Sequence, residues 1–288
     1  MITYDKIPDY YDWLSRYVQL ANWLAYRDRF ASFTMHKTLS VPSGAGGTIK
    51  RTAGLEYVNN RLLEAARLPT APRVLDAGCG FGGTIFHWHN RIGGSYDGLT
   101  LSRVQLRVAQ REARRRRIEG ACRFHLQSYD APLAATYDAV VAVESLIHSP
   151  DLNTTIPNLA KGLRRGGLMI ILDDMAEVDL EGEAPAEANL LRIHWGCARY
   201  AKQEDYRGAL NKARLRVIYE EDLTAQVEPR DSAKLEKLEA RYNRLYKAIR
   251  LTSARTVLSA YIGGLSLERL YLKGCVCYRL LVARKDEE

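Results

Sequence analysis

The chain has 288 residues, of which 47% are apolar and 26% are charged. These fractions are typical of globular proteins and exclude a largely disordered chain, and no apolar run approaches the roughly 18 residues that a membrane span needs. The five cysteines form no Cys-x-x-Cys pair, so neither a disulfide framework nor a zinc site is indicated. The length predicts one large domain or two ordinary ones, and the net charge of +8 leaves an anionic partner open.

The start of the chain is acidic and lacks the basic stretch and apolar core of a secretion signal, so we expect a cytoplasmic protein. We predict an aromatic helix over residues 9–30, because apolar side chains recur there at 3.6-residue spacing. A glycine-rich linker at 40–48 follows, which predicts a helical cap or lid over residues 1–50 and a larger domain over residues 51–288. The apolar face of the predicted helix comprises Tyr10, Trp13, Leu14, Tyr17 and Val18.

The centre of the chain alternates short apolar runs with helical segments, which indicates a parallel α/β sheet with right-handed crossovers. Two later runs, at 215–219 and 276–283, are expected to close the sheet as its sixth and seventh strands. Helical insertions near 185–212 and 231–262 are expected to extend the cap. The first five strands are expected at 73–77, 95–99, 122–126, 137–143 and 168–172, and the main helices at 54–67, 84–90, 102–117, 153–163, 232–250 and 254–261.

The most informative segment is the turn after the first expected strand, from Val74 to Thr84. Asp76 ends the strand, and a G-x-G-x-G run leads into a helix. Glycines let the backbone approach a ligand closely, and a helix start offers free N–H groups and a positive dipole end. A dinucleotide site would have G-x-G-x-x-G, and a carboxylate so near would repel a pyrophosphate, so the turn suits a ligand with an ammonium group. The alternative is a plain tight turn between strand and helix.

This segment resembles motif I of the class I S-adenosylmethionine-dependent methyltransferases. Asp138 in the fourth strand resembles the acid of the family's "fDxv" motif, and Leu163 to Leu168 resembles its "LkpGG" turn. The three motifs follow the family's order across residues 70–175. The resemblance implies a Rossmann-like seven-stranded, mostly parallel sheet with helices on both faces and a helical cap. It also implies a methyltransferase with S-adenosyl-L-methionine as cofactor and no metal.

The turn after the second strand departs from the family's usual acid and resembles the G-x-T-x-S-x-x-Q pattern of the cyclopropane-fatty-acid synthase and sterol or tocopherol C-methyltransferase branch. Thr100 and Gln105 then replace the acid as hydrogen-bonding partners of the ribose. Ser128 and Tyr129 stand where the family has an Asp near adenine, and offer a hydroxyl and a stacking ring. By this resemblance the cofactor-binding residues are Asp76, Gly78, Cys79, Gly80, Gly82, Thr100, Leu101, Gln105, Ser128, Tyr129 and Glu144.

Glu144 and His148 follow the fourth strand, in a stretch similar to the E-x-x-x-H-x-P-D of sterol C-methyltransferases. Methyl transfer to an alkene creates a carbocation, which aromatic faces stabilise, and a base must then remove a proton. We therefore expect Glu144 and His148 to be catalytic. The structural alternatives are that Glu144 binds a backbone amide and that His148 caps the next helix. The candidate substrate-binding residues are Tyr10, Tyr11, Trp13, Tyr17, His194 and Tyr246.

The predicted function is C-methylation of an alkene carbon in an isoprenoid, through a cation that can cyclise before it loses a proton. The substrate is either a prenylated natural product or a prenyl diphosphate. The stretch from Gly263 to Lys285 resembles the ends of bacterial secondary-metabolite methyltransferases, which agrees with a role in secondary metabolism. Methylation of nitrogen or oxygen in a small natural product is the alternative. Asp173 and Asp174 have three candidate roles: binding a substrate ammonium, holding Mg²⁺ for a diphosphate, or a plain helix-cap or loop role.

A nucleic-acid partner is not expected, because the chain lacks an N/D-P-P-Y/F motif and a basic segment interleaved with aromatics outside the core. The arginine run at 114–117 lies on a helix expected to face solvent. Arg241, Arg244 and Arg250 lie on the predicted 232–250 helix and could meet a diphosphate or an oligomer interface, which leaves a homo-oligomer open. A scaffold that has lost activity is the remaining alternative.

Overall fold

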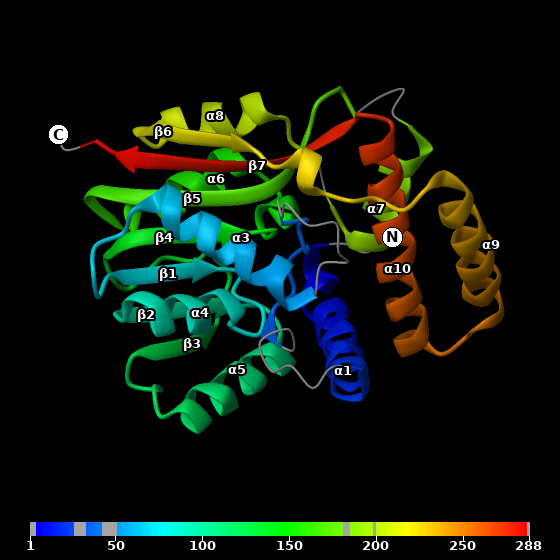
Figure 1. Ribbon diagram of the computed structural model, residues 1–288, viewed down its shortest axis with the longest axis horizontal. Helices are drawn as coiled ribbons and strands as arrows, with labels where there is room; N and C mark the ends of the chain where they lie inside the picture. Colours follow the sequence, from blue (N-terminus) through cyan, green and yellow to red (C-terminus); the bar gives the residue numbers. More distant parts are fainter. Residues whose placement is uncertain (1–3, 26–32, 42–50, 181–184, 198–199, 287–288) are drawn as a thin grey trace.

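A seven-stranded sheet forms the centre of the molecule, in the order β3-β2-β1-β4-β5-β7-β6 (Figure 1). The strands β1 to β5 are parallel, and β7 runs antiparallel to both of its neighbours. This arrangement confirms the predicted α/β class with a Rossmann-like, mostly parallel sheet. The computed structural model describes residues 4–25, 33–41, 51–180, 185–197 and 200–286.

The secondary-structure elements agree closely with the sequence expectations. The strands are β1 (Arg73–Ala77), β2 (Ser95–Thr100), β3 (Cys122–Leu126), β4 (Tyr137–Val143), β5 (Leu163–Ala176), β6 (Leu215–Asp222) and β7 (Val276–Lys285). The helices are α1 (Ile7–Ala25), α3 (Arg51–Ala66), α4 (Gly83–Ile92), α5 (Arg103–Arg116), α6 (Leu152–Lys161), α7 (Ala186–Trp195), α8 (Gln203–Lys212), α9 (Ser232–Ala248) and α10 (Thr252–Leu272).

β5 and α10 extend furthest beyond their expected ranges. β5 extends past the expected 168–172 because β7 pairs with it as far as Ala176. α10 continues through Gly263 and Gly264, where we expected the helix to have ended. A Cβ at Gly263 would lie 2.3 Å from the indole of Trp195, so this glycine makes room for α7 to pack closely against α10.

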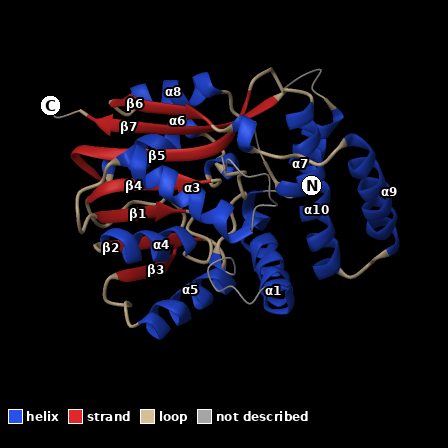
Figure 2. Cartoon of the chain, in the orientation of Figure 1, coloured by secondary structure: helices blue, strands red, loops and turns tan. Residues whose placement is uncertain are grey.

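Helices cover both faces of the sheet, as Figure 2 shows. α3, α4 and α5 pack on one face, and α6 and α8 on the other. β4 and β5 are buried almost throughout, which explains their nearly continuous apolar sequences. Of the helices in the described residues, none is both long and apolar enough to cross a bilayer.

The cap consists of α1, α7, α9 and α10, which lie beyond the carboxyl ends of the parallel strands (Figure 1). α10 contacts α1, α7 and α9, so the two chain ends build one layer. Asp12 fastens α1 to the sheet domain by accepting hydrogen bonds from the Ser102 hydroxyl at 2.5 Å and the Val104 amide at 3.1 Å. These donors belong to the start of α5, whose amides lack partners within the helix. Residues 26–30 of the predicted 9–30 helix and residues 42–48 of the predicted linker lie outside the described residues.

Candidate active site

The glycine-rich turn between β1 and α4 adopts a backbone that other residues rarely reach. Gly78, Gly80 and Gly82 have φ values of +97°, +53° and +87°. A Cβ at Gly78 would lie 2.5 Å from the Cβ of Ser145, so even the smallest side chain would displace the loop after β4. The turn therefore brings bare backbone against the ends of β1 and β4, as a ligand-binding turn requires.

Asp76 lies below this turn at the end of β1 and is 3% exposed. Burial raises the pKa of its carboxyl group to about 7. Among the described residues, no hydrogen bond or ion pair to this carboxyl group is found. A buried acid without a partner favours a ligand that brings a positive charge, such as an ammonium group.

A cavity of about 360 Å³ lies between this turn, the end of β4 and helix α1. A smaller space of about 40 Å³ contains Asp76 and Cys79 and shares the walls formed by Gly78 and Gly80. The charged side chains of the described residues that line the larger cavity are Glu144 and Asp174, both acidic. Its lining also includes Ile7, Tyr10, Tyr11, Leu14, Val18, Met35, His36, Thr100, Leu101, Gln105, Tyr129, His148 and Trp195.

Most of the predicted cofactor residues meet around these two spaces. The Thr100 hydroxyl donates to Gln105 Oε1 at 2.6 Å, and the Tyr129 hydroxyl donates to the Ser145 carbonyl at 3.1 Å. Ser128 does not line either space; its hydroxyl accepts from the Asp130 amide at 3.0 Å and stabilises a turn. Gly82 also lies outside them and packs beneath the Phe124 ring.

Glu144 occupies a strained position at the cavity wall, with a φ of +49° that is rare for a residue with a side chain. Its Oε1 accepts from the Lys37 amide at 2.9 Å and from the Tyr278 hydroxyl at 2.7 Å. Burial alone would raise the pKa of Glu144, but the Lys37 charge and these hydrogen bonds hold it below its usual value. Glu144 therefore binds a backbone amide, as the structural alternative supposed, and also presents a carboxylate to the cavity.

Lys37 is the site residue that sequence reasoning missed. Its ammonium donates to Asp174 Oδ2 at 2.5 Å, lies 3.3 Å from Glu144 Oε1 and sits 4.7 Å from the ring centre of Tyr278. Tyr271 donates to the other oxygen of Asp174. The acid pair keeps the pKa of Lys37 above its ordinary value despite burial, whereas burial raises the pKa of Asp174 and the lysine only partly offsets this. The Asp174 carboxyl group is thus paired with the Lys37 ammonium.

His148 faces the same cavity from the short turn after β4. Its Nε2 lies 2.6 Å from the Tyr11 hydroxyl, and its buried Nδ1 has no hydrogen-bond partner among the residues that the structure describes. Burial lowers the pKa of His148 to about 4, so the imidazole is neutral at physiological pH. His148 does not cap the next helix, because Asp151 does so by accepting from the Asn153 amide at 3.0 Å.

The structure brings two of the six predicted substrate residues, Tyr10 and Tyr11, into the cavity. Trp13 and Tyr17 are 39% and 38% exposed and lie on a neighbouring face of α1, because the cavity side of that helix follows Ile7, Tyr11, Leu14 and Val18. His194 Nδ1 lies 3.0 Å from the Ser259 hydroxyl, and its ring is 5.4 Å from that of Tyr246. Both residues pack among the cap helices outside the cavity.

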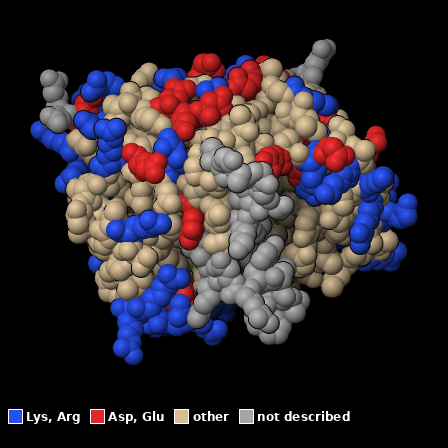
Figure 3. All heavy atoms as spheres, viewed as in Figure 1, with Lys and Arg blue, Asp and Glu red and all other residues tan. Residues whose placement is uncertain are grey.

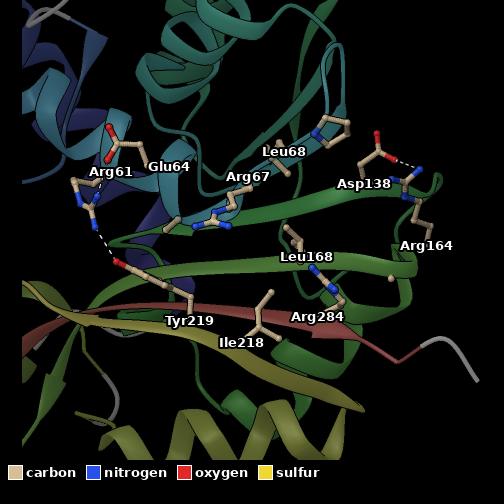
Figure 4. A pocket seen from close by; sticks show the side chains of 14 residues that line it. Arg61, Glu64, Arg67, Leu68, Asp138, Arg164, Leu168, Ile218, Tyr219 and Arg284 are labelled. Carbon is tan, nitrogen blue, oxygen red and sulfur yellow. Dashed lines mark hydrogen bonds and ion pairs between the residues drawn. The ribbon is translucent and has the colours of Figure 1, made fainter.

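A separate cavity of about 670 Å³ lies at the opposite, amino-terminal edge of the sheet. Figure 4 shows Arg61 beside Glu64 and Tyr219, and Asp138 beside Arg164. Asp138, the acid of the predicted fourth-strand motif, also accepts from the Arg73 amide at 2.7 Å and so joins β4 to β1. Among the described residues, no group of three or more His, Cys, Asp or Glu side chains is arranged to hold a metal ion.

Comparison with known proteins identifies the class. Residues 74–167, roughly a third of the chain, match the family model described as a methyltransferase domain. Methyltransferase GfsG of Streptomyces halstedii is 28% identical over 182 residues, 62% of this chain and 66% of that protein. O-methyltransferase cnsE of Penicillium expansum is 28% identical over 184 residues, 60% of this chain and 64% of that protein. The matches span just under two thirds of the length of these relatives.

Solved structures share the fold over nearly the whole chain. The [4+2]-cyclase SpnF has a TM-score of 0.75 at 17% identity and covers 99% of this chain and 97% of its own. A geranyl diphosphate methyltransferase in complex with GPP and sinefungin has a TM-score of 0.74 at 20% identity, covering 98% and 99%. Residues 74–167 therefore match a methyltransferase domain, and the chain shares its fold with solved methyltransferases, one of them in complex with SAM.

The Lys37 cluster leads to a prediction about stability. Lys37→Met should lower the free energy of unfolding by about 3 kcal/mol or more at pH 7, because it leaves Glu144 and Asp174 buried without their cation. Denaturant unfolding measures the loss, which should grow as the pH rises and more carboxyl groups ionise. Lys247→Met on the exposed face of α9 is the control and should change stability little. A stable Lys37→Met variant would show that the cluster does not depend on the ammonium.

The buried imidazole of His148 leads to a prediction about pH. Its pKa is about 4 in the folded chain against 6.5 for the free side chain, so below pH 6.5 the unfolded state binds the proton first. Stability should therefore decline as the pH falls from 6.5 to 4, with His148 contributing on the order of 3 kcal/mol. His148→Gln should remove that share of the decline in denaturant titrations, whereas His125→Gln at an exposed site should not. Equal curves for all three proteins would contradict a buried neutral His148.

Proposed function

We propose that the protein methylates an alkene carbon of a neutral isoprenoid natural product and that His148 removes the proton that the resulting cation must lose. The observation that carries this proposal is a neutral, weakly basic imidazole in a cavity with aromatic and aliphatic walls, whose charged side chains among the described residues are both acidic. S-adenosylmethionine, when bound, supplies an electrophilic methyl group. The argument below concerns what this chain's own residues contribute.

The residues around the glycine turn suit such a cofactor. The buried Asp76 fits an ammonium group, and the bare turn at Gly78 and Gly80 lets a ligand approach the backbone. Thr100 and Gln105 offer hydroxyl and amide groups for ribose hydroxyls, and they line the same cavity as His148. The cofactor-binding assignment of these residues therefore agrees with their burial and chemistry.

The basicity of His148 favours carbon over oxygen as the acceptor. A base with a pKa of about 4 is poorly matched to a phenol, whose pKa is about 10, and worse to an alcohol. A carbocation next to a C–H bond gives its proton even to a weak base. In the proposed reaction the alkene π electrons would bond to the methyl carbon while its bond to the cofactor sulfur breaks, and that electron pair would leave with S-adenosylhomocysteine. The C–H bond next to the cation would then break to restore a double bond, and His148 would take the proton.

The charges near the cavity favour a neutral substrate over a diphosphate. Glu144 is held ionised, and an ionised wall attracts a developing cation but repels a diphosphate. Arg241 and Arg244, which we had considered as diphosphate ligands, lie exposed on α9, and Arg250 is exposed just beyond it. None of these three lines the cavity. The Tyr10 and Tyr11 rings and the Trp195 indole suit a prenyl chain.

Oxygen methylation is a second candidate, and one observation favours it. O-methyltransferases occur among the relatives. An enzyme of that kind would need the base to become stronger once the substrate binds.

The two candidates predict different products. We would incubate the enzyme with methyl-labelled S-adenosylmethionine and matched sets of neutral prenylated compounds, prenyl diphosphates and prenyl alcohols. Carbon NMR should show the label on carbon, on a neutral substrate, with a new double bond. His148→Gln should lower turnover by about 100-fold or more, the usual contribution of a positioned base, while leaving S-adenosylhomocysteine binding unchanged. A methoxy product would replace this proposal with oxygen methylation.

The raised pKa of Asp76 predicts that the affinity for the cofactor depends on pH. With a pKa near 7 it is partly protonated, and an arriving ammonium should expel that proton. S-adenosylhomocysteine should therefore bind more tightly as the pH rises from 6 toward 7, while the number of protons released on binding falls, because less of the free Asp76 is protonated at pH 7. Calorimetry in buffers of different ionisation enthalpy measures this release. Asp76→Asn should bind more weakly and lose the pH dependence; retention of both would place the ammonium elsewhere.

A further inference from the structure

Helices α1 and α5 lie side by side and enclose a groove of about 710 Å³ on the outer surface. The groove is separate from the cavity beside the glycine turn, and the two share no lining residue among those described. Its floor is apolar, from Val104, Val108 and Phe33, and its rim is formed by arginines from both helices. The rim arginines are Arg16, Arg107, Arg111, Arg114 and Arg115.

The α1 side of this groove exposes large apolar groups. Trp13 is 39% exposed and Leu20 is 58% exposed. With Arg16 they are spaced i, i+3 and i+7, which places all three on one face of the helix. The Arg16 guanidinium lies 4.8 Å from the Trp13 ring centre, so aromatic and cationic groups are adjacent there.

The α5 side supplies positive charge that its own acid does not neutralise. Arg107, Arg111 and Arg114 are exposed and share one face through their i, i+4 and i+7 spacing. Glu112, the acid in this groove, is buried and bound by Arg115 and Arg116 at 2.5 and 2.8 Å. Figure 3 shows Lys and Arg gathered along the edge of the molecule where Figure 1 places α5. Like charges on one helix repel, so this face favours an anionic partner.

We propose that this α1–α5 surface, formed by Trp13, Arg16, Leu20, Arg107, Arg111 and Arg114, docks on an anionic lipid bilayer. Tryptophan favours the boundary between head groups and acyl chains, leucine inserts just below it, and arginines bind lipid phosphates. Nucleic acid would use the charge but would gain nothing from an exposed leucine. The combination of charge with aliphatic and aromatic exposure therefore favours a membrane surface.

The opposite face of α1 gives this surface a use. Tyr11, Leu14 and Val18 line the cavity, so one helix would separate the bilayer from the site of methyl transfer. A neutral isoprenoid partitions into lipid, and docking would bring the cavity to its source. This last step rests on the proposed function, whereas vesicle binding does not and is measured without a methyl acceptor.

The test is co-sedimentation of the full chain with phosphatidylcholine vesicles, with and without phosphatidylglycerol. Binding should need phosphatidylglycerol and weaken with salt. Reversing Arg107, Arg111 and Arg114 to Glu should weaken it at least about tenfold, since each basic residue at such a surface contributes about 1 kcal/mol. Trp13→Ala with Leu20→Ala should weaken it severalfold. The matched controls are the reversal of Arg241, Arg244 and Lys247 to Glu on α9, and Leu251→Ala with Leu272→Ala at exposed sites of the cap.

Every outcome decides the proposal. Loss of binding in the α1–α5 variants alone, with unchanged thermal unfolding and S-adenosylhomocysteine binding, supports it. Equal binding to both vesicle types, or equal losses in the controls, overturns it. Displacement by a DNA duplex or by inorganic phosphate, with no effect of Trp13→Ala and Leu20→Ala, would show a plain anion site and also overturn it.

Discussion

The partly buried ammonium of Lys37 is the group on which the cavity wall depends. It joins the segment around residues 33–41 to Asp174 at the end of β5 and to Glu144 beyond β4, and Tyr278 of β7 completes the contact. Burying two carboxyl groups in an ionised state without a cation would cost several kcal/mol each. The acidic wall of the cavity can therefore exist only where the N-terminal segment covers the carboxyl ends of the strands. The segment that carries Lys37 is therefore part of the structure that this acidic wall requires.

The acids around the site share a preference for positive charge, and this preference links cofactor binding to the proposed methyl transfer. Asp76 is a buried acid without a counter-charge, and Glu144 is an ionised acid at the wall of the adjoining cavity. Both favour positive charge: the first suits an ammonium group, and the second suits a cation that develops on an alkene. His148 complements them because it stays neutral and so does not oppose that cation. Under the proposed function the cofactor would use the first feature, and the alkene of the acceptor would use the other two.

The fold and the cofactor side of the site could be predicted because their signals are local. The glycine turn, Thr100 and Gln105 stand next to strand ends, and parallel strands bring such ends to one edge of the sheet. Lys37 could not be predicted, since its partner Asp174 lies 137 residues away and no local pattern marks either residue as paired. Helical spacing also could not say which face of α1 meets the cavity, so Trp13 was predicted to be inside although it is exposed.

The Asp12 contact helps to fix the orientation of α1, because the apolar residues of this helix are spread around most of its circumference. A rotation of about one residue, roughly 100°, would turn Trp13 inward and leave other aromatic groups outside. It would also remove the Asp12 carboxylate from the Ser102 hydroxyl and the Val104 amide, and a lost helix cap costs about 1 kcal/mol. The contact of Asp12 with the start of α5 is thus compatible with Tyr11 beside His148 and Trp13 at the surface. Helix α1 therefore carries large apolar groups on two faces. One face lines the cavity, and the other, with Trp13 and Leu20, is exposed.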